Sequence, residues 1–382
     1  MSREAHAAAT SMLCAAFGSD TQISRVRSVA GDRGRSAIHR LSLSGPSAPE
    51  TVISKQLKVA AMPGDNEPLE LFSSELASLQ FLGGLDVANL VPTLHAYDPV
   101  ERILLCEDLG ELPSLADVLQ GGDGAEADAA LREYAETLGT LNGGTVACRD
   151  SLIDHRQALG LADDTTAWSD DVATLRSDLP EALSLLGLGI GSLIADDLDA
   201  LVEDLTDESC WPSFTHGDPC PDNNVIESTG RVRFFDFEFS RVRPAMVDAA
   251  YLVVPFPTCW CVAQLPASMT EQLESTYRTS FARHVPEARE DARWGAAITA
   301  GSAAWMLSEI CRRMPLLMEN DRDWGLSTWR QRLLYRLPAF VELVERHGQR
   351  RALGELAGMV HRQLATEWED TDRIAGYAAF GD

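Results

Sequence analysis

The residue types best suited to chemistry are concentrated in one segment, FTHGDPCPDNNVIESTGRVRFFDFEFS, which covers residues 214–240. A His-Gly-Asp triplet ends at Asp218, Asn223 follows after four intervening residues, and Asp236 lies thirteen residues beyond Asn223. One carboxylate can accept or orient the proton of an attacking hydroxyl, while an amide oxygen and a second carboxylate hold Mg²⁺ against phosphate oxygens. Each residue alone would suit an ordinary loop, but the three in this order and spacing indicate phosphoryl transfer to a hydroxyl.

This segment resembles the aminoglycoside phosphotransferase and choline kinase group of the protein-kinase-like superfamily. That group writes its catalytic loop as His-Gly-Asp followed by Asn, and its metal-binding triplet as Asp, Phe or Trp, and Glu, which HGDPCPDN and DFE match. The resemblance extends more loosely over nearly the whole chain. It implies that Asp218 is the catalytic base or orienting group, that Asn223 and Asp236 hold Mg²⁺, and that ATP or GTP is the phosphoryl donor.

The surroundings of these residues depart from the family pattern in two places. Asp222 replaces the small residue that often precedes the metal-binding Asn, and its carboxylate would face either the metal or the acceptor. Pro219-Cys220-Pro221 also differs from the usual loop, although neither change removes a catalytic group. Asp248, in the stretch DAAY, matches a family residue that begins a helix and braces the catalytic loop, so we expect it to bind backbone or an arginine there.

The same chemistry requires a lysine on the third strand that contacts the α- and β-phosphates, and a helix glutamate that holds it. Lys55 in TVISKQL and Glu75 in FSSELASLQFL are the candidates. Lys58 competes with Lys55 but would point to the other face of the strand. A solvated strand lysine and a surface glutamate are the alternatives. Only these two of the 32 basic residues are lysines, and a compact ammonium suits a site between phosphates, which favours Lys55.

The loop between the first two predicted strands is a candidate phosphate-covering loop. The stretch VAGDRGRSAIHRL carries glycines but not the complete glycine-rich pattern of protein kinases. We predict that backbone N–H groups near Gly34 and the hydroxyl of Ser36 approach the phosphates. A simple turn between two strands would look the same in sequence.

The stretch ILLCEDLGELPSLADVL fits the connection between two lobes. The resemblance implies that Glu107 and Leu109 present a backbone carbonyl and a backbone N–H to the adenine. Cys106 would then lie just inside the nucleotide pocket. An ordinary strand end is the alternative interpretation.

Hydrophobic periodicity places these residues on definite elements. Residues 1–18 predict a short amphipathic helix, and period-2 alternation over residues 22–60 predicts three antiparallel strands. A helix at about 67–83 and two strands, at 90–98 and 101–109, follow. Further helices are predicted near 114–120, 125–147, 192–206, 268–283, 289–312, 326–346 and 349–366.

We therefore expect an α+β protein with the bilobal protein-kinase-like fold. Residues 1–110 would form a small antiparallel β-sheet lobe with one main helix, which binds the nucleotide. Residues 111–382 would form a larger, mostly helical lobe, which carries the catalytic loop and binds the acceptor. The length of 382 residues suits one large or two moderate domains.

Composition excludes several other classes of protein. The chain has 32 basic and 58 acidic residues and a net charge of −26, so it is a poor general binder of nucleic acid or anionic membrane. No apolar run of about 18 residues predicts a transmembrane helix. The eight cysteines are scattered, and Cys259-Trp-Cys261 lacks a second pair at zinc-like spacing. Reduced thiols in a cytoplasmic monomer or homodimer are the simpler interpretation.

The acceptor is the part that the sequence determines least. Glu319, Asp321 and Asp323 would favour a cationic substrate but suit a solvated face equally well. Four tryptophans would form either an aromatic box for a quaternary amine or ordinary packing: Trp260, Trp305, Trp324 and Trp329. We expect a small-molecule hydroxyl acceptor, namely an aminoglycoside-like, sugar or nucleoside antibiotic or metabolite. A choline- or homoserine-type amino-alcohol kinase and a non-catalytic kinase-like binding protein are the alternatives.

Overall fold

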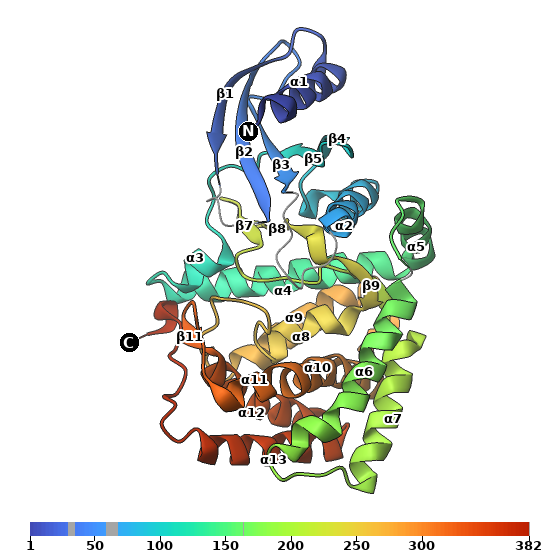
Figure 1. Cartoon of the computed structure of the whole chain (residues 1–382), viewed down its shortest axis with the longest axis vertical. Coiled ribbons are helices and arrows are strands. Elements are labelled where there is room, and N and C mark those ends of the chain that lie inside the picture. The colour runs from blue at the N-terminus through green and yellow to red at the C-terminus, as the bar shows by residue number, and fades with distance from the viewer. Residues whose placement is uncertain (30–34, 59–67, 163, 382) are drawn as a thin grey trace. The chain divides into compact units, whose positions relative to one another are not determined.

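The computed structural model describes residues 1–29, 35–58, 68–162 and 164–381. These residues fold as two units, whose elements are labelled in Figure 1. The first unit comprises Met1–Leu112, Asp154–Leu161 and Arg233–Ser240, and the second comprises Pro113–Ile153, Ala162–Val232 and Arg241–Asp382. Within the described ranges, no helix is both long enough and apolar enough to cross a bilayer.

The first unit is built on a five-stranded antiparallel sheet, as the alternation in the sequence predicted. Its strands are β1 (Gln22–Ser28), β2 (Ser36–Ser44), β3 (Thr51–Leu57), β4 (Leu94–Asp98) and β5 (Ile103–Glu107), in the spatial order β1-β2-β3-β5-β4. β3 is the middle strand, with Lys55 opposite Ile38 on β2 and Leu104 on β5. Pairing on both sides fixes the backbone from which Lys55 projects.

One helix precedes the first three strands and one follows them, as predicted. α1 (Arg3–Phe17) begins after Ser2, whose hydroxyl accepts a hydrogen bond from the backbone N–H of Ala5. Its buried residues recur every four positions and pack on the sheet in a core of Ala5, Ala9, Leu13, Leu41, Val52, Ile103 and Leu105. α2 (Pro68–Leu82) buries the apolar residues that recur every three or four positions, Leu71, Phe72, Leu76, Leu79 and Leu82.

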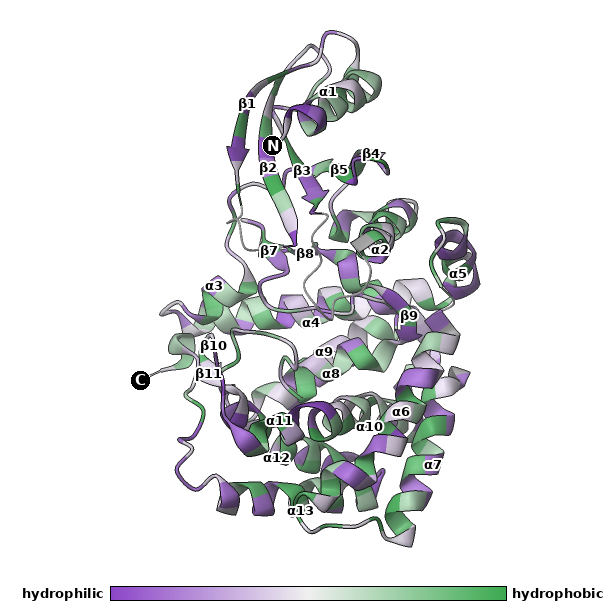
Figure 2. Cartoon of the chain, in the orientation of Figure 1, coloured by the Kyte–Doolittle hydropathy of each residue, from purple (hydrophilic) through white to green (hydrophobic). Residues whose placement is uncertain are grey.

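The second unit is mostly helical, which confirms the predicted α+β class. Its long helices are α4 (Gly124–Val146), α6 (Asp164–Ser184), α7 (Ser192–Thr206), α9 (Met269–Phe281), α10 (Asp291–Ser308), α12 (Trp329–His347) and α13 (Arg351–Glu367). Its shorter helices are α3 (Leu115–Leu119), α8 (Ala245–Val253) and α11 (Met314–Glu319), while α5 (Arg149–Ala158) runs from the second unit into the first. Figure 2 shows hydrophilic and hydrophobic positions alternating along α7, whose buried residues are Ile194, Leu198, Leu201 and Leu205.

Two glycines let α4 approach α9 closely enough to place polar side chains between them. A Cβ at Gly139 would lie 2.6 Å from the carbonyl oxygen of Tyr277, and a Cβ at Gly143 would lie 3.0 Å from that of Phe281. Larger residues would force the two helices apart. This contact fixes the depth at which Asn142, between the two glycines, reaches toward the catalytic loop.

Hydrophobic periodicity did not predict four helices in the described part of the chain, namely α5, α6, α8 and α11, and of these only α8 was expected, from the family resemblance of the stretch DAAY. All nine residues of α8 are buried, so its sequence has no amphipathic period to recognise. α6 contains Pro180, which reads as a helix breaker. The helix predicted at 326–346 begins only at Trp329, because Thr328 and Gln331 form a capping box. Before it lies a small hairpin of β10 (Asp323–Trp324) and β11 (Ser327–Thr328).

Candidate active site

The catalytic loop of the second unit follows β6 (Pro212–Thr215), which pairs with β9 (Arg241–Pro244). Gly217 has a φ of 85°, a left-handed conformation that favours glycine, and it turns the chain toward Asp218. The carboxylate of Asp248, on α8, accepts hydrogen bonds from the backbone N–H groups of His216 (2.7 Å) and Gly217 (3.4 Å). The expectation that Asp248 binds backbone near the catalytic loop is confirmed.

Other buried polar residues brace the same loop and were not found from the sequence. Asn142 donates from Nδ2 to the carbonyl of Phe214 (2.9 Å) and accepts at Oδ1 from the hydroxyl of Tyr277 (2.8 Å). The hydroxyl of Tyr134 donates to the carbonyl of Pro219. The asparagine in the glycine-rich run TLNGGT, inside a helix that buries one face, was the available signal, since a buried amide needs partners.

Asp218 and Asn223 lie together at the end of this loop. The side-chain Nδ2 of Asn223 donates to the backbone carbonyl of Asp218 (2.8 Å) and lies 3.4 Å from its carboxylate Oδ2. Because Nδ2 faces Asp218, the amide oxygen of Asn223 points to the other side of the amide group. Oδ1 of Asp218 accepts a hydrogen bond from the hydroxyl of Thr258, and the hydroxyl of Tyr251 lies 3.5 Å away. The sequence gave no indication of these two partners.

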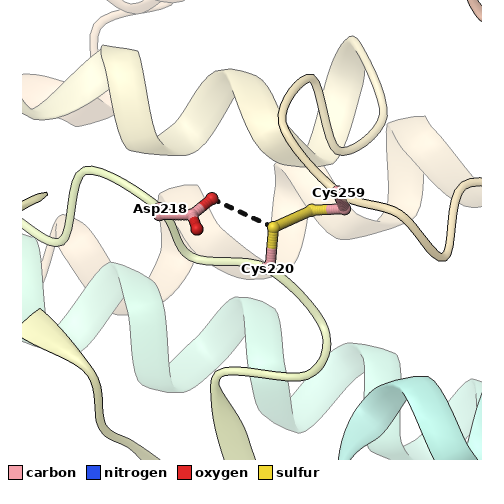
Figure 3. A group of neighbouring side chains, drawn as sticks. All are labelled: Asp218, Cys220 and Cys259. Carbon is pink, nitrogen blue, oxygen red and sulfur yellow. Dashed lines mark hydrogen bonds between the residues drawn. A yellow bond between two sulfur atoms is a disulfide. The ribbon is translucent and has the colours of Figure 1, made fainter. Parts of the chain in front are cut away.

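A disulfide lies beside Asp218, which contradicts the expectation of eight free thiols. Cys220 and Cys259 are bonded, with their Cα atoms 5.5 Å apart, and Figure 3 shows the bond next to the carboxylate of Asp218. The other six cysteines are free. The two bonded cysteines are 39 positions apart in sequence, and only the fold brings the catalytic loop and the segment after α8 together. Spacing alone therefore did not reveal the pair.

The first unit gathers three carboxylates around one lysine. The Nζ of Lys55, on β3, lies 2.5 Å from Oε2 of Glu75, on α2, and 3.8 Å from Oε2 of Glu238, and it also contacts Oδ1 of Asp236. Asp236 follows β8 (Val232–Phe234), and Glu238 lies in the short 3₁₀ helix η3 (Phe237–Phe239). Arg35 lies 3.2 Å from the other carboxylate oxygen of Glu238, Oε1. The predicted lysine and helix glutamate thus form an ion pair, and the residues DFE lie beside it.

Burial or neighbouring charges raise the pKa values of Lys55, Glu75 and Glu238. Burial works to lower the pKa of Lys55, but the charges of Asp236, Glu75 and Glu238 raise it above its usual value. Burial raises the pKa of Glu75 to about 7, against the opposing charge of Lys55. Burial and the charge of Asp236 likewise raise the pKa of Glu238. The three carboxylates outnumber the positive charges of Lys55 and Arg35, so the cluster keeps a surplus of negative charge.

The backbone holds Asp236 in an uncommon conformation. Its φ of 68° and ψ of 59° lie in the left-handed region, which few residues other than glycine occupy. The segment that follows is fastened to α2 by a hydrogen bond of 2.6 Å between the hydroxyls of Ser78 and Ser240. Such conformations persist where the surrounding structure over-determines them, and they cluster at functional sites.

The predicted adenine-binding stretch is fixed through its side chains. Both carboxylate oxygens of Glu107 accept hydrogen bonds of 2.7 Å from Arg233, and its pKa is lowered chiefly by that arginine. Asp108 makes a two-pronged ion pair with Arg40 on β2. Leu109 follows and is half-buried. Because Arg233 engages the carboxylate of Glu107, the role predicted for this residue toward the nucleotide would fall to its backbone. The two arginines were missed.

The predicted phosphate loop is described only in part. Ser36 begins β2 opposite Leu57, and its hydroxyl is buried without a hydrogen-bond partner among the described residues. Gly34 lies outside the described residues. The predicted site residues thus form two groups. Lys55, Glu75, Asp236, Glu107, Leu109 and Ser36 belong to the first unit, and Asp218 and Asn223 belong to the second.

The tryptophans proposed as an aromatic box are packed by the protein itself. The rings of Trp324 and Trp329 stack with centroids 4.6 Å apart. The guanidinium of Arg332 lies 4.7 Å and 5.2 Å from their centroids, and that of Arg313 lies 3.9 Å from Trp329. Because the protein's own cations occupy these ring faces, the structure favours the packing interpretation for this pair.

The remaining acceptor candidates also have structural partners. The indole N–H of Trp260 donates to Oδ2 of Asp222 (2.5 Å), and that of Trp305 donates to the carbonyl of Val247 (2.9 Å). The carboxylate of Asp321 accepts hydrogen bonds from the backbone N–H groups of Arg322 and Arg330, so it organises a turn. Glu319 and Asp323 are exposed. Of these acidic residues, Asp222 stands closest in sequence to Asp218.

The fold and the two residue groups define a class of protein, the kinase-like phosphotransferases, in which a five-stranded antiparallel sheet precedes a mostly helical part. The chain belongs to the phosphotransferase enzyme family APH, whose sequence model matches residues 30–288, more than half of its length. No curated protein matches the chain at a significant level.

Solved structures resemble the chain at low sequence identity, and one of them, a choline kinase, shows the same fold. Choline kinase from Cryptosporidium parvum Iowa II superposes with a TM-score of 0.52 at 12% identity, over 94% of this chain and 99% of that one. A putative aminoglycoside phosphotransferase from Ralstonia eutropha JMP134 gives 0.47 at 14% identity, over 97% and 99%. The ADP-bound aminoglycoside phosphotransferase APH(2'')-Ib gives 0.47 at 15% identity, over 94% and 99%. At 12% identity the likeness to the choline kinase is one of fold alone.

Proposed function

We propose that this protein is an ATP- and Mg²⁺-dependent small-molecule O-phosphotransferase. It transfers the γ-phosphoryl group of ATP, or of GTP, to a hydroxyl of an aminoglycoside-like, sugar or nucleoside antibiotic or metabolite. The observation that carries the proposal is the cluster of Lys55, Glu75 and Asp236, since a buried lysine held by carboxylates is what phosphate contact and metal binding require. Residues 1–110 would form the nucleotide lobe and residues 111–382 the catalytic and acceptor lobe.

The donor groups suit Mg²⁺. Asp236 offers carboxylate oxygens and Asn223 an amide oxygen that its hydrogen bonds to Asp218 turn outward. Hard oxygen donors are what Mg²⁺ prefers, and the surplus of carboxylates around Lys55 leaves negative charge for it to offset. Asn223 and Asp236 would hold the ion, which when bound offsets the charge of the phosphate oxygens.

The residues of the chain would then act by positioning and by charge. Oδ1 of Asp218 accepts from Thr258, so we assign Oδ2 to the proton of the acceptor hydroxyl. Lys55 would contact the α- and β-phosphates while Glu75 holds its ammonium. The backbone of Glu107 and Leu109 would bind the adenine, and Ser36 and Gly34 would cover the phosphates. Catalysis of this kind depends mainly on pre-set geometry.

The direct test is phosphate transfer from Mg-ATP to a library of hydroxyl compounds. The wild type should phosphorylate at least one of them, and Asp218→Asn should lower kcat by roughly 10²–10⁴-fold because it removes the base. The matched control is Asp370→Asn, an exposed aspartate outside the site, which should leave kcat unchanged. Equal turnover by Asp218→Asn and the wild type would refute the assignment.

The amino-alcohol alternative has less support in the structure than in the sequence. It rested on the tryptophans, and arginines cover the faces of Trp324 and Trp329. The non-catalytic alternative would require the loss of a catalytic group, whereas the lysine, the base and both metal ligands are present in the sequence. A thermal-shift screen of choline-like amines against aminoglycosides, with Mg-ADP present, separates the acceptor classes.

A further inference from the structure

The segment that follows α8 runs along the catalytic loop and contacts it at three successive points. Thr258 donates to the carboxylate of Asp218, Cys259 is bonded to Cys220, and Trp260 donates to Asp222. Three consecutive residues thus engage every second residue of the loop, 218, 220 and 222. The family motif does not include this segment. Because Thr258 contacts the carboxylate of Asp218, the segment can influence the reaction that we propose.

Thr258 is the end of a short chain of hydroxyl groups that leads to Asp218. The phenol of Tyr251, on α8, is fully buried and lies 2.7 Å from the hydroxyl oxygen of Thr258. Thr258 has one hydroxyl proton, which it directs to Oδ1 of Asp218. Tyr251 donates to Thr258 and Thr258 donates to Asp218, so the relay fixes one oxygen of the carboxylate and orients the other.

Two buried arginines hold the backbone of this segment. Arg332, on α12, donates to the carbonyls of Cys259 (2.7 Å) and Trp260 (3.0 Å). Arg336, one turn further along, donates to the carbonyls of Pro255 (3.1 Å) and Phe256 (2.7 Å). Both side chains are at most 2% exposed. Such hydrogen bonds to charged donors are stronger than neutral ones, so the loop presents Thr258 from a rigid base.

The disulfide fastens this segment to the catalytic loop itself. Cys220 and Cys259 are 3% and 0% exposed, and Sγ of Cys220 lies 3.0 Å from Oδ1 of Asp218. Figure 3 shows the disulfide beside this carboxylate. In the bonded state this sulfur carries no proton. Oδ1 therefore receives the proton of Thr258 and none from Cys220. Reduction would give Cys220 an S–H that competes for the same oxygen.

We propose that Thr258 is a positioning residue for Asp218, and that the Cys220–Cys259 disulfide keeps it in place, so that reduction of this bond lowers the rate of phosphoryl transfer. The inference rests on the proposed function only in taking Asp218 as the catalytic carboxylate. A dithiol reductant supplies the two electrons. The sulfur–sulfur bond breaks, Cys220 and Cys259 each gain a proton, and the reductant is oxidised to its own disulfide.

The hydroxyl is tested by comparing Thr258→Val, which removes it at nearly constant volume, with Thr258→Ser, which keeps it. Thr258→Val should lower kcat about 10- to 100-fold, the usual cost of losing a group that orients a catalytic side chain, with both KM values within about twofold of wild type. Thr258→Ser should recover most of the rate. Thr258→Val with wild-type kcat would overturn the proposal, and so would a serine variant as slow as the valine variant.

The disulfide is tested on the whole protein with and without dithiothreitol. The oxidised protein should show six reactive thiols after denaturation, corresponding to the six free cysteines, and reduction should lower kcat several-fold, reversibly. The Cys220→Ala/Cys259→Ala variant should be slow and insensitive to dithiothreitol. Cys148→Ser, at a half-buried free cysteine, should respond like the wild type. If the oxidised and the reduced protein had equal kcat, the disulfide would not control the rate of phosphoryl transfer.

Failure of this inference and failure of the proposed function give different results. If the wild type transfers phosphate and Asp218→Asn does not, a fully active Thr258→Val removes only the inference. If no transfer occurs, the proposed function fails. Crystal structures of Thr258→Val and Thr258→Ser then still decide the positioning, since the Asp218 carboxylate should turn away from its wild-type orientation only in the valine variant.

Discussion

Lys55 is one of two lysines in a chain that otherwise uses arginine, and its surroundings explain why. Its ammonium fits between Glu75 and Asp236 with 13% of the side chain exposed. A guanidinium is larger and planar and would not fit in the space that the ammonium occupies between both carboxylates. We predict that Lys55→Arg raises the KM for ATP about tenfold or more in steady-state kinetics. Lys58→Arg is the matched control and should behave like the wild type.

The raised pKa of Glu75 predicts how stability depends on pH. Its carboxyl has a pKa near 7 in the folded protein against an ordinary value of 4.5, so between these values the folded state binds more protons than the unfolded state. Stability from this group is therefore greatest at low pH and falls as the pH rises through about 4.5–7. As the pH is lowered from 7.5 to 5, the free energy of unfolding of the wild type should rise relative to that of Glu75→Gln by on the order of 1–3 kcal/mol, measured by thermal unfolding. A difference independent of pH would contradict this pKa.

The residues that could be found from the sequence are those in a compact pattern. Asp218, Asn223 and Asp236 stand at fixed spacing, and Lys55 was marked by composition. Thr258 could not be recognised from the sequence, because its partner Asp218 lies 40 positions away. The disulfide was missed for the same reason, since a separation of 39 residues says nothing of the distance between Cα atoms.

At the scale of elements, the close contact of α4 with α9 predicts a large difference between two glycine substitutions. Gly139→Ala would bring a Cβ to 2.6 Å from the carbonyl oxygen of Tyr277, whereas a Cβ at Gly189 has nothing within 4 Å. The first substitution should lower the free energy of unfolding by about 1–3 kcal/mol. The second should change it little or raise it slightly. Urea denaturation measures both, and equal stability of the two variants would contradict the packing.

Elements were predictable where one side of them is buried. The strands of the sheet and the helices α2, α4 and α7 show a period of two or of three to four residues. α8 shows no such period because it is buried all round, so only the family resemblance of DAAY indicated a helix there. It carries Tyr251 and Asp248, which both serve the catalytic loop. The pattern that reveals an element thus fails where the element is most enclosed.

At the scale of the whole molecule, the net charge of −26 opposes the binding of a polyanionic nucleotide. Only local groups can overcome this field. In the first unit these are Lys55 and Arg35, and the carboxylates of Glu75, Asp236 and Glu238 outnumber them. From the sequence, the same charge predicts that the chain is a poor general binder of nucleic acid. It does not identify the acceptor, because acidic residues such as Asp321 prove to organise turns of the chain itself.

This surplus of negative charge predicts that the affinity for nucleotide depends strongly on Mg²⁺. In a thermal-shift titration, ADP with Mg²⁺ should raise the melting temperature, and EDTA should abolish the shift, because without the ion the carboxylates around Lys55 face the phosphates directly. Asp236→Asn removes a metal ligand and one negative charge together. It should therefore weaken binding of Mg-ADP about tenfold or more while allowing some binding of ADP in EDTA, which the wild type lacks. Binding of ADP that is equally tight with and without Mg²⁺ in the wild type would show that the surplus carboxylates play no part in the nucleotide site.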